Sequence, residues 1–188
     1  MTDLPRQLLA YGILPLWVAA GLADWWCHRR TSIETTSGVR ESAFHLALFA
    51  QMGVGVLAVL LLQVNAAILL LLGLLFVLHE LTTWAELRFV VARREVRPIE
   101  QMIHSLMEIL PLSALLLLVV VAGMNASLPD WRLRLKDEPL PPAYLVGVVV
   151  AVVLLNVLPL LEEFRRCWRA RPAMKRPPRP GGATARMD

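Results

Sequence analysis

Long apolar runs alternate along this chain with short segments rich in basic and other polar residues. Five of these runs reach the roughly 20 residues that an α-helix needs to cross the hydrocarbon core of a bilayer. The expected spans are about 8–27, 43–63, 66–87, 102–124 and 143–163. The pattern therefore predicts an all-α integral membrane protein with five transmembrane helices, in a single domain over residues 1–170.

The third span is the least uniform of the five. Its continuous apolar run, residues 66–78, is too short to cross a bilayer, so the span is complete only if His79 and Glu80 belong to the membrane helix. Ionisable groups at such a depth are costly unless they are paired or bound to a ligand. Their presence indicates a functional site.

The connections between the spans predict how the first four helices form a bundle. Residues 63–65 leave room only for a tight turn, so the second and third spans are expected to be antiparallel neighbours. Thr31 and Glu34 form a Thr-x-x-Glu capping-box pattern, which predicts a short helical turn before the second span. Pro98 suits the first turn of a helix and predicts the start of the fourth span.

Basic residues predict the orientation of the chain. If the N-terminus lies outside the cell, 15 of the 19 Lys and Arg residues fall in inner segments and four fall in outer segments. This bias predicts a multi-pass protein of a bacterial-type inner membrane, with the N-terminus outside and the C-terminus in the cytoplasm. The basic, proline-rich tail at 171–188 is expected to be disordered and attracted to anionic lipid heads. No pattern of basic and aromatic residues indicates nucleic-acid binding.

Each of the four histidines has a carboxylate close to it in the sequence. Three such pairs are four residues apart and therefore share one helix face, whereas His79 directly precedes Glu80. In the predicted topology all of these groups lie in one layer, at the cytoplasmic side of the four-helix bundle. The nine candidate metal ligands are Asp24, His28, Glu41, His45, His79, Glu80, Glu100, His104 and Glu108.

The third helix offers two candidate acids. Glu86 lies two turns after His79 on the same helix face, but Glu80 lies deeper in the membrane and has the stronger need of a partner, so Glu80 is preferred. Arginines near this layer could pair with its acids: Arg40, Arg94 and Arg97.

The fifth span differs from the other four. It has no histidine, and its acids, Glu162 and Glu163, come only at its inner end. It is expected to be a packing helix, or a contact between copies in an oligomer, and to donate no ligand.

The number of ligands predicts two metal ions. Four imidazoles and a similar number of carboxylates exceed what one four-coordinate zinc ion needs. Helix bundles that hold paired iron or manganese ions take carboxylates and histidines from several helices. Iron is the first choice for both ions, with zinc and manganese as alternatives. The sequence assigns no residue a catalytic role.

In its ligand types the chain resembles the alternative oxidases, and in the position of the site near the cytoplasmic face it resembles the membrane fatty-acid desaturases and hydroxylases. The resemblance covers about residues 20–110 and rests on the histidine–carboxylate pairs, which here have an i+4 spacing in place of Glu-x-x-His. It implies a non-haem di-iron oxidoreductase. Such an enzyme acts on a lipid or lipid-soluble substrate and takes its electrons from a separate donor.

Other functions are compatible with the same residues. Three histidines and a carboxylate could serve a membrane zinc hydrolase. Histidines from two helices could be axial ligands in a haem-binding electron carrier. A transporter, or a structural or assembly subunit with a metal-free polar network, would also place ionisable groups within spans.

Overall fold

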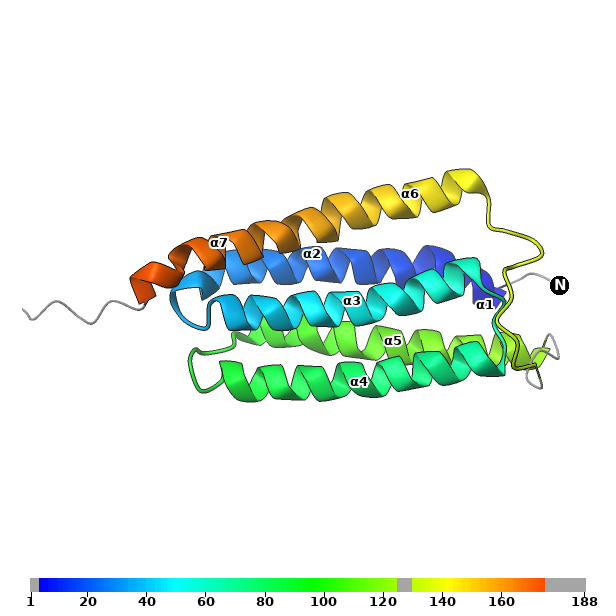
Figure 1. Cartoon of the computed structure of the whole chain (residues 1–188), viewed down its shortest axis with the longest axis horizontal. Helices are drawn as coiled ribbons and strands as arrows, with labels where there is room; N and C mark the ends of the chain where they lie inside the picture. The colour runs from blue at the N-terminus through cyan, green and yellow to red at the C-terminus, as the bar shows by residue number, and fades with distance from the viewer. Residues whose placement is uncertain (1–3, 125–129, 175–188) are drawn as a thin grey trace, which may run out of the picture.

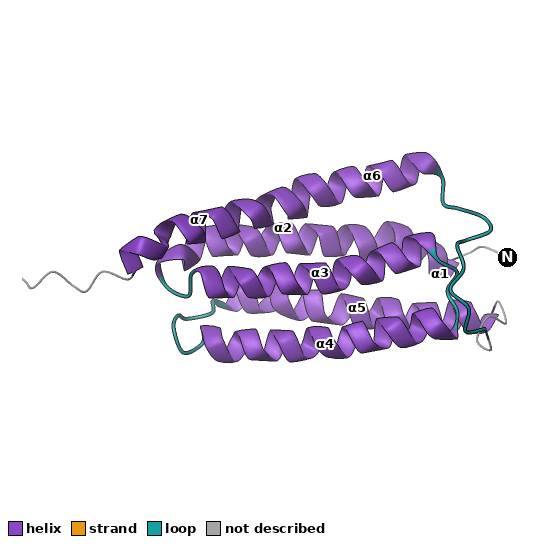
Figure 2. Ribbon diagram, viewed as in Figure 1, coloured by secondary structure: helices purple, strands orange, loops and turns teal. Residues whose placement is uncertain are grey.

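The computed structural model describes residues 4–124 and 130–174, and its long elements are all helices (Figures 1 and 2). The first rod joins α1 (Leu4–Gln7), the π-helical segment η1 (Leu8–Ile13) and α2 (Leu14–Thr31). The next three are α3 (Val39–Leu61), α4 (Ala66–Val90) and α5 (Pro98–Met124). The last joins α6 (Pro142–Val152), the π-helical segment η3 (Val153–Val157) and α7 (Leu158–Met174).

These five rods are long and apolar enough to cross a membrane, which confirms the predicted all-α class and the number of spans. The described residues contain no strand, only one antiparallel bridge between Leu62 and Leu135. The fifth rod continues to Met174, about three turns beyond the predicted end of its span. The tail at 175–188 and the loop residues 125–129 lie outside the described residues.

The α3–α4 hairpin follows from its short connection. The Asn65 side chain caps α4 by accepting a hydrogen bond from the backbone N–H of Ile68 at 3.2 Å. The two helices pack along each other as antiparallel neighbours, as predicted (Figure 1). The α5 helix begins at Pro98, also as predicted.

The connection from α2 to α3 contains the predicted helical turn, the 3₁₀ segment η2 (Ile33–Thr35). The predicted capping box is wrong, because Thr31 is still part of α2 and its hydroxyl donates to the Cys27 carbonyl at 3.1 Å. Glu34 instead forms an ion pair with Arg166 of α7. This segment therefore fastens the last rod to the first two.

The outer loop lies over the α3–α4 turn. The Gln63 N–H donates to the Arg134 carbonyl at 2.9 Å, and the Lys136 N–H donates to the Leu61 carbonyl at 3.0 Å. The Asn65 side chain donates to the Arg132 carbonyl at 2.7 Å. Residues 132–136 are thus held by backbone hydrogen bonds to the hairpin, although they pair too briefly to count as a strand.

The distribution of buried residues is that of a protein in lipid. Many large apolar side chains are exposed around the rods, whereas the largest fully buried side chains include His28, Glu41, Glu100 and Glu163. Acidic residues are seldom fully buried unless they are paired. The polar interior is concentrated where α2, α4 and α7 end and α3 and α5 begin, which is called the cluster end below (left in Figure 1).

Candidate metal centre

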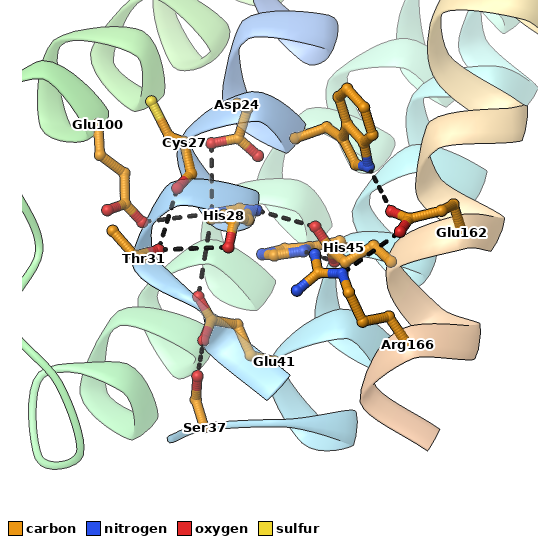
Figure 3. Close-up of polar contacts among 12 residues, drawn as sticks. Asp24, Cys27, His28, Thr31, Ser37, Glu41, His45, Glu100, Glu162 and Arg166 are labelled. Atoms are coloured by element: carbon orange, nitrogen blue, oxygen red, sulfur yellow. Dashed lines mark hydrogen bonds and ion pairs between the residues drawn. The ribbon is translucent and has the colours of Figure 1, made fainter. Parts of the chain in front are cut away.

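Side chains from all five rods meet at the cluster end. Figure 3 shows His28 in the middle, with Asp24, Glu41 and Glu100 around it and His45 beside it. The histidine–carboxylate cluster comprises Asp24, His28, Glu41, His45, Glu86, Glu100, His104 and Glu163. Its central members are almost inaccessible, because His28, Glu41, Glu100 and Glu163 are at most 1% exposed.

His28 presents one ring nitrogen to three acids. Its Nε2 lies 3.2 Å from Glu100 Oε1, 3.5 Å from Asp24 Oδ1 and 3.9 Å from Glu41 Oε1. Three carboxylate oxygens around one buried imidazole nitrogen form an arrangement that could hold a cation.

His45 repeats this arrangement. Its Nε2 lies 2.7 Å from Glu86 Oε1. The rings of His28 and His45 are stacked, with centroids 4.4 Å apart and planes within 3° of parallel. The two Nε2 atoms therefore belong to a pair of stacked, nearly parallel imidazole rings.

Glu163 of α7 contacts the other ring nitrogen, Nδ1, of both imidazoles. Its Oε2 contacts His28 Nδ1 at 3.1 Å, and its Oε1 contacts His45 Nδ1 at 2.7 Å. A neutral imidazole that donates its Nδ1 proton to a carboxylate keeps the lone pair of Nε2 free. Histidines that bind metals are usually oriented in this way, by a carboxylate on the second ring nitrogen.

His104 uses its ring differently from the other two. Its Nε2 is hydrogen-bonded to Asp24 Oδ1 at 2.9 Å, and its ring centroid lies 6.2 Å from that of His28. Asp24 therefore lies between two imidazoles from different helices.

Arg94, from the loop between α4 and α5, closes the cluster. Its guanidinium donates to Glu41 through Nε at 3.2 Å and to Glu100 through Nη1 at 3.0 Å, and Nη2 contacts both acids. Burial by itself would lower the pKa of Arg94, but the hydrogen bonds to Glu100 and Glu41 outweigh it and raise the pKa above its usual value. Arg40, a second predicted partner, instead lies over the Phe89 ring at 4.5 Å.

The formal charge of the cluster is strongly negative. Its five carboxylates face one guanidinium, so neutral histidines leave a net charge of −4. Such a charge is very unfavourable in a buried site unless it is compensated. Two divalent cations would cancel it, whereas protonation of all three histidines would still leave −1.

Three sets of these side chains could hold a metal ion, because one ligand atom from each member lies within 4.8 Å of the others. The sets are Asp24 with His28 and His45, His28 with Glu100 and His104, and Glu41 with His45 and Glu86. Bonds of about 2.0–2.2 Å place two ligands of one ion up to about 4.4 Å apart, so each set needs little adjustment to bind.

The structure brings six of the nine predicted ligands together in the cluster: Asp24, His28, Glu41, His45, Glu100 and His104. His79, Glu80 and Glu108 belong to none of the sets within the described residues. His79 precedes Glu86 by seven residues, which is about 10 Å along α4. His79 therefore lies deeper than the cluster, and the structure does not bring these three residues into it.

Two cluster acids, Glu86 and Glu163, are not among the nine predicted ligands. Glu86, and not the preferred Glu80, contacts His45, because Glu80 is too deep along α4 to reach the layer. Glu163 was assigned to a helix without ligands, yet it contacts two histidines. The signal that could have found Glu163 was its position, since an acid at the inner end of the fifth span lies level with the histidines of the first and second.

Comparisons with protein families, with curated proteins and with solved structures found no match for this chain.

Proposed function

We propose that this chain is a membrane-embedded non-haem di-metal oxidoreductase, with two iron ions in the histidine–carboxylate cluster. The contact of Glu163 with both Nδ1 atoms is the strongest support, because it leaves Nε2 of His28 and of His45 directed at carboxylate oxygens. One ion would bind at each Nε2. In this proposal the first four rods form the bundle that encloses the site, and α7 closes it.

The donor set supports iron. It combines imidazole nitrogens with carboxylate oxygens, and neither buried cysteine, Cys27 or Cys167, belongs to a candidate set in the described part of the chain. Imidazole and carboxylate ligands suit iron, manganese and zinc, while thiolates would favour zinc or copper. Iron with open positions would use O₂ as the oxidant, and a separate donor would supply the electrons.

The surroundings of the cluster support a lipid-soluble substrate. A cavity of about 400 Å³ with largely apolar walls reaches Asp24, His45 and Glu163. A substrate dissolved in the bilayer could therefore reach the cluster without crossing water.

The cluster end is proposed to face the cytoplasm. Besides the excess of basic residues there, four arginines lie over tryptophan rings at this end: Arg29 over Trp25 at 5.4 Å, Arg30 over Trp26 at 3.7 Å, Arg88 over Trp84 at 4.7 Å and Arg171 over Trp168 at 5.1 Å. Aromatic rings and basic side chains of this kind mark the level of the lipid headgroups. The oligomer contact through the fifth span stays a prediction.

Metal analysis of detergent-purified protein tests the proposal. We expect about two iron ions per chain by plasma mass spectrometry, lost in His45→Ala, because His45 anchors one ion and stacks on the other anchor. Glu80→Gln, on the neighbouring helix but outside the cluster, is the control and should keep both ions. A carefully prepared wild type without metal would refute the proposal and leave a polar network.

A zinc hydrolase is the second candidate. The set of His28, Glu100 and His104 has two imidazoles and one carboxylate, which is a ligand combination of catalytic zinc sites. A content of one zinc ion per chain, with activity unaffected by reductants, would favour this function over the di-iron one.

A further inference from the structure

The cavity beside the cluster continues deep into the membrane interior. It lies between α2, α3 and the fifth rod, with part of α4 and α5 in its wall. At about 400 Å³ it falls within the size range of small-molecule sites. Most of its lining is apolar, so the few polar groups away from the cluster show what it is suited to bind.

His79 is the most informative of these groups. It lines the cavity, is 5% exposed, and its Nδ1 has no hydrogen-bond partner among the described residues. A buried imidazole without a partner is costly, and the hydrocarbon of the bilayer offers none. His79 also lies about 10 Å deeper than Glu86, so the cluster cannot satisfy it.

We propose that this cavity binds a neutral lipid with one long apolar chain and a hydroxyl group, and that His79 forms a hydrogen bond with that hydroxyl. A hydroxyl both donates and accepts, so it pairs with either tautomer of His79. It can also donate to the carboxylate of Glu108, which lines the same cavity. A ketone or ester oxygen only accepts and would leave Glu108 without a donor.

The charges around this part of the cavity favour a neutral ligand. Glu108 and Glu80 lie close enough for their charges to interact, and Glu80 Oε1 has no hydrogen-bond partner in the described part of the chain. An anionic headgroup would be repelled by these acids and by the cluster beyond them. A headgroup of either sign would also lose its hydration in the apolar cavity.

The shape of the fifth rod gives such a lipid a way in. Its α7 half packs against α2 and α3, whereas the α6 half leans away from α3 (Figure 1) and contacts the first rod near its start, where the Tyr144 hydroxyl donates to the Ala10 carbonyl at 2.9 Å. The cavity is partly open, and Val149, Val152 and Val153 of this rod form part of its wall. A chain in the bilayer can therefore enter from the side, between α3 and the fifth rod.

A second cavity lies next to the first. It has a volume of about 200 Å³, is also almost wholly apolar, and shares five lining residues with the first: Leu14, Trp17, Met52, Val56 and Leu60. The two cavities thus border the same side chains of α2 and α3. A hydroxyl at His79 would direct the chain away from the cluster and place the carbon that bears the oxygen nearest to it.

A reaction at the carbon that bears the hydroxyl rests on the proposed function. Binding of the lipid in the cavity does not, so this binding is measured with and without metal. The probe is 9,10-dibromo-octadecan-1-ol, whose bromines quench tryptophan fluorescence, added to the protein in nanodiscs before and after chelation. Trp17 and Trp25 line the cavity and report occupancy. The comparison probes are the corresponding dibromo-octadecanoate and dibromo-octadecane.

Two glycines provide matched variants. An added Cβ would meet nothing within 4 Å at Gly53 or at Gly73, but only Gly53 lines the cavity. Gly53→Leu should therefore fill the cavity, and Gly73→Leu should change only the outer surface of α4. His79→Phe keeps the bulk of the ring and removes its hydrogen bond.

We expect saturable quenching by the alcohol, weakened about tenfold or more by His79→Phe and by Gly53→Leu and unchanged by Gly73→Leu. The acid and the alkane should bind about tenfold more weakly than the alcohol. Equal quenching by all three probes, or equal binding to wild type and both cavity variants, would overturn the proposal. Specific binding by a protein that holds no metal would support this inference while refuting the proposed function.

Discussion

Replacing Glu163 by glutamine tests the central geometric feature of the cluster. The ionised carboxylate has two acceptor oxygens, and each contacts the Nδ1 of a different histidine. The amide has nearly the same shape but only one acceptor, and its nitrogen is a donor. At most one imidazole can then keep its Nδ1 proton directed at residue 163. The other must turn or move its proton to Nε2, the atom that would bind metal.

The distances indicate which imidazole is lost. Glu163 is 2.7 Å from His45 but 3.1 Å from His28, so the amide oxygen should remain with His45. Loss of such an outer contact lowers metal affinity about 10–100-fold, or about 1.4–2.7 kcal/mol. We therefore expect Glu163→Gln to keep the ion at His45 and to lose most of the ion at His28. Its metal content should fall from about two ions per chain to about one.

The assay is metal content under increasing concentrations of a competing chelator, with folding followed by circular dichroism. Glu162→Gln is the matched control, because Glu162 is adjacent on α7 but contacts Trp25 at 2.9 Å and Arg29 at 3.5 Å, outside the cluster. If Glu163→Gln retained two ions with unchanged affinity, the orientation of the histidines by Glu163 would be refuted. Equal losses in both variants would mean that α7 had lost its packing, which would also contradict the reasoning.

Three further predictions concern stability. Arg94→Met leaves Glu41 and Glu100 without their guanidinium and should lower the free energy of unfolding by about 3–5 kcal/mol in detergent. Its control is Arg93→Met, at an exposed arginine, which should change the free energy of unfolding by less than about 0.5 kcal/mol. Asn65→Ala removes the cap of α4 and a bond to the Arg132 carbonyl, and should cost about 1–2 kcal/mol by thermal unfolding. Removal of metal by a chelator should lower the midpoint temperature of unfolding of wild type but leave that of His45→Ala unchanged. Equal midpoint temperatures for wild type with and without chelator would contradict a metal-stabilised cluster.

The elements of the fold were predictable because lipid constrains them strongly. Only a helix satisfies its own backbone in hydrocarbon, so apolar runs of sufficient length had one structural solution. The turn before Asn65 and the start of α5 at Pro98 follow from local stereochemistry, and both were predicted. Where α7 ends was not predictable, since Arg165 and Arg166 end the apolar run without ending the helix.

The cluster was predictable only where both partners lie on one helix. In each of the i+4 pairs Asp24–His28 and Glu41–His45 the two residues share a helix face, so both members of the pair lie in the cluster. Contacts between helices depend on how far each rod slides and turns relative to its neighbours, which hydropathy does not specify. For this reason the choice between Glu80 and Glu86, and the part played by Glu163, emerged only from the assembled helices.

Polar contacts at the cluster end also account for the form of the fifth rod. Burial of apolar surface contributes little free energy to the association of helices in lipid. Close packing and hydrogen bonds between the helices therefore determine which parts stay in contact. The α7 half is held by Glu163 in the cluster and by the pair of Arg166 with Glu34, and the Asn156 side chain donates to the Val18 carbonyl at 3.1 Å just before α7. The α6 half is almost entirely apolar and has one polar contact with the first rod, in which the Tyr144 hydroxyl donates to the Ala10 carbonyl at 2.9 Å. The same carboxylate that contacts the two histidines thus also holds the α7 half of this rod against the first two rods.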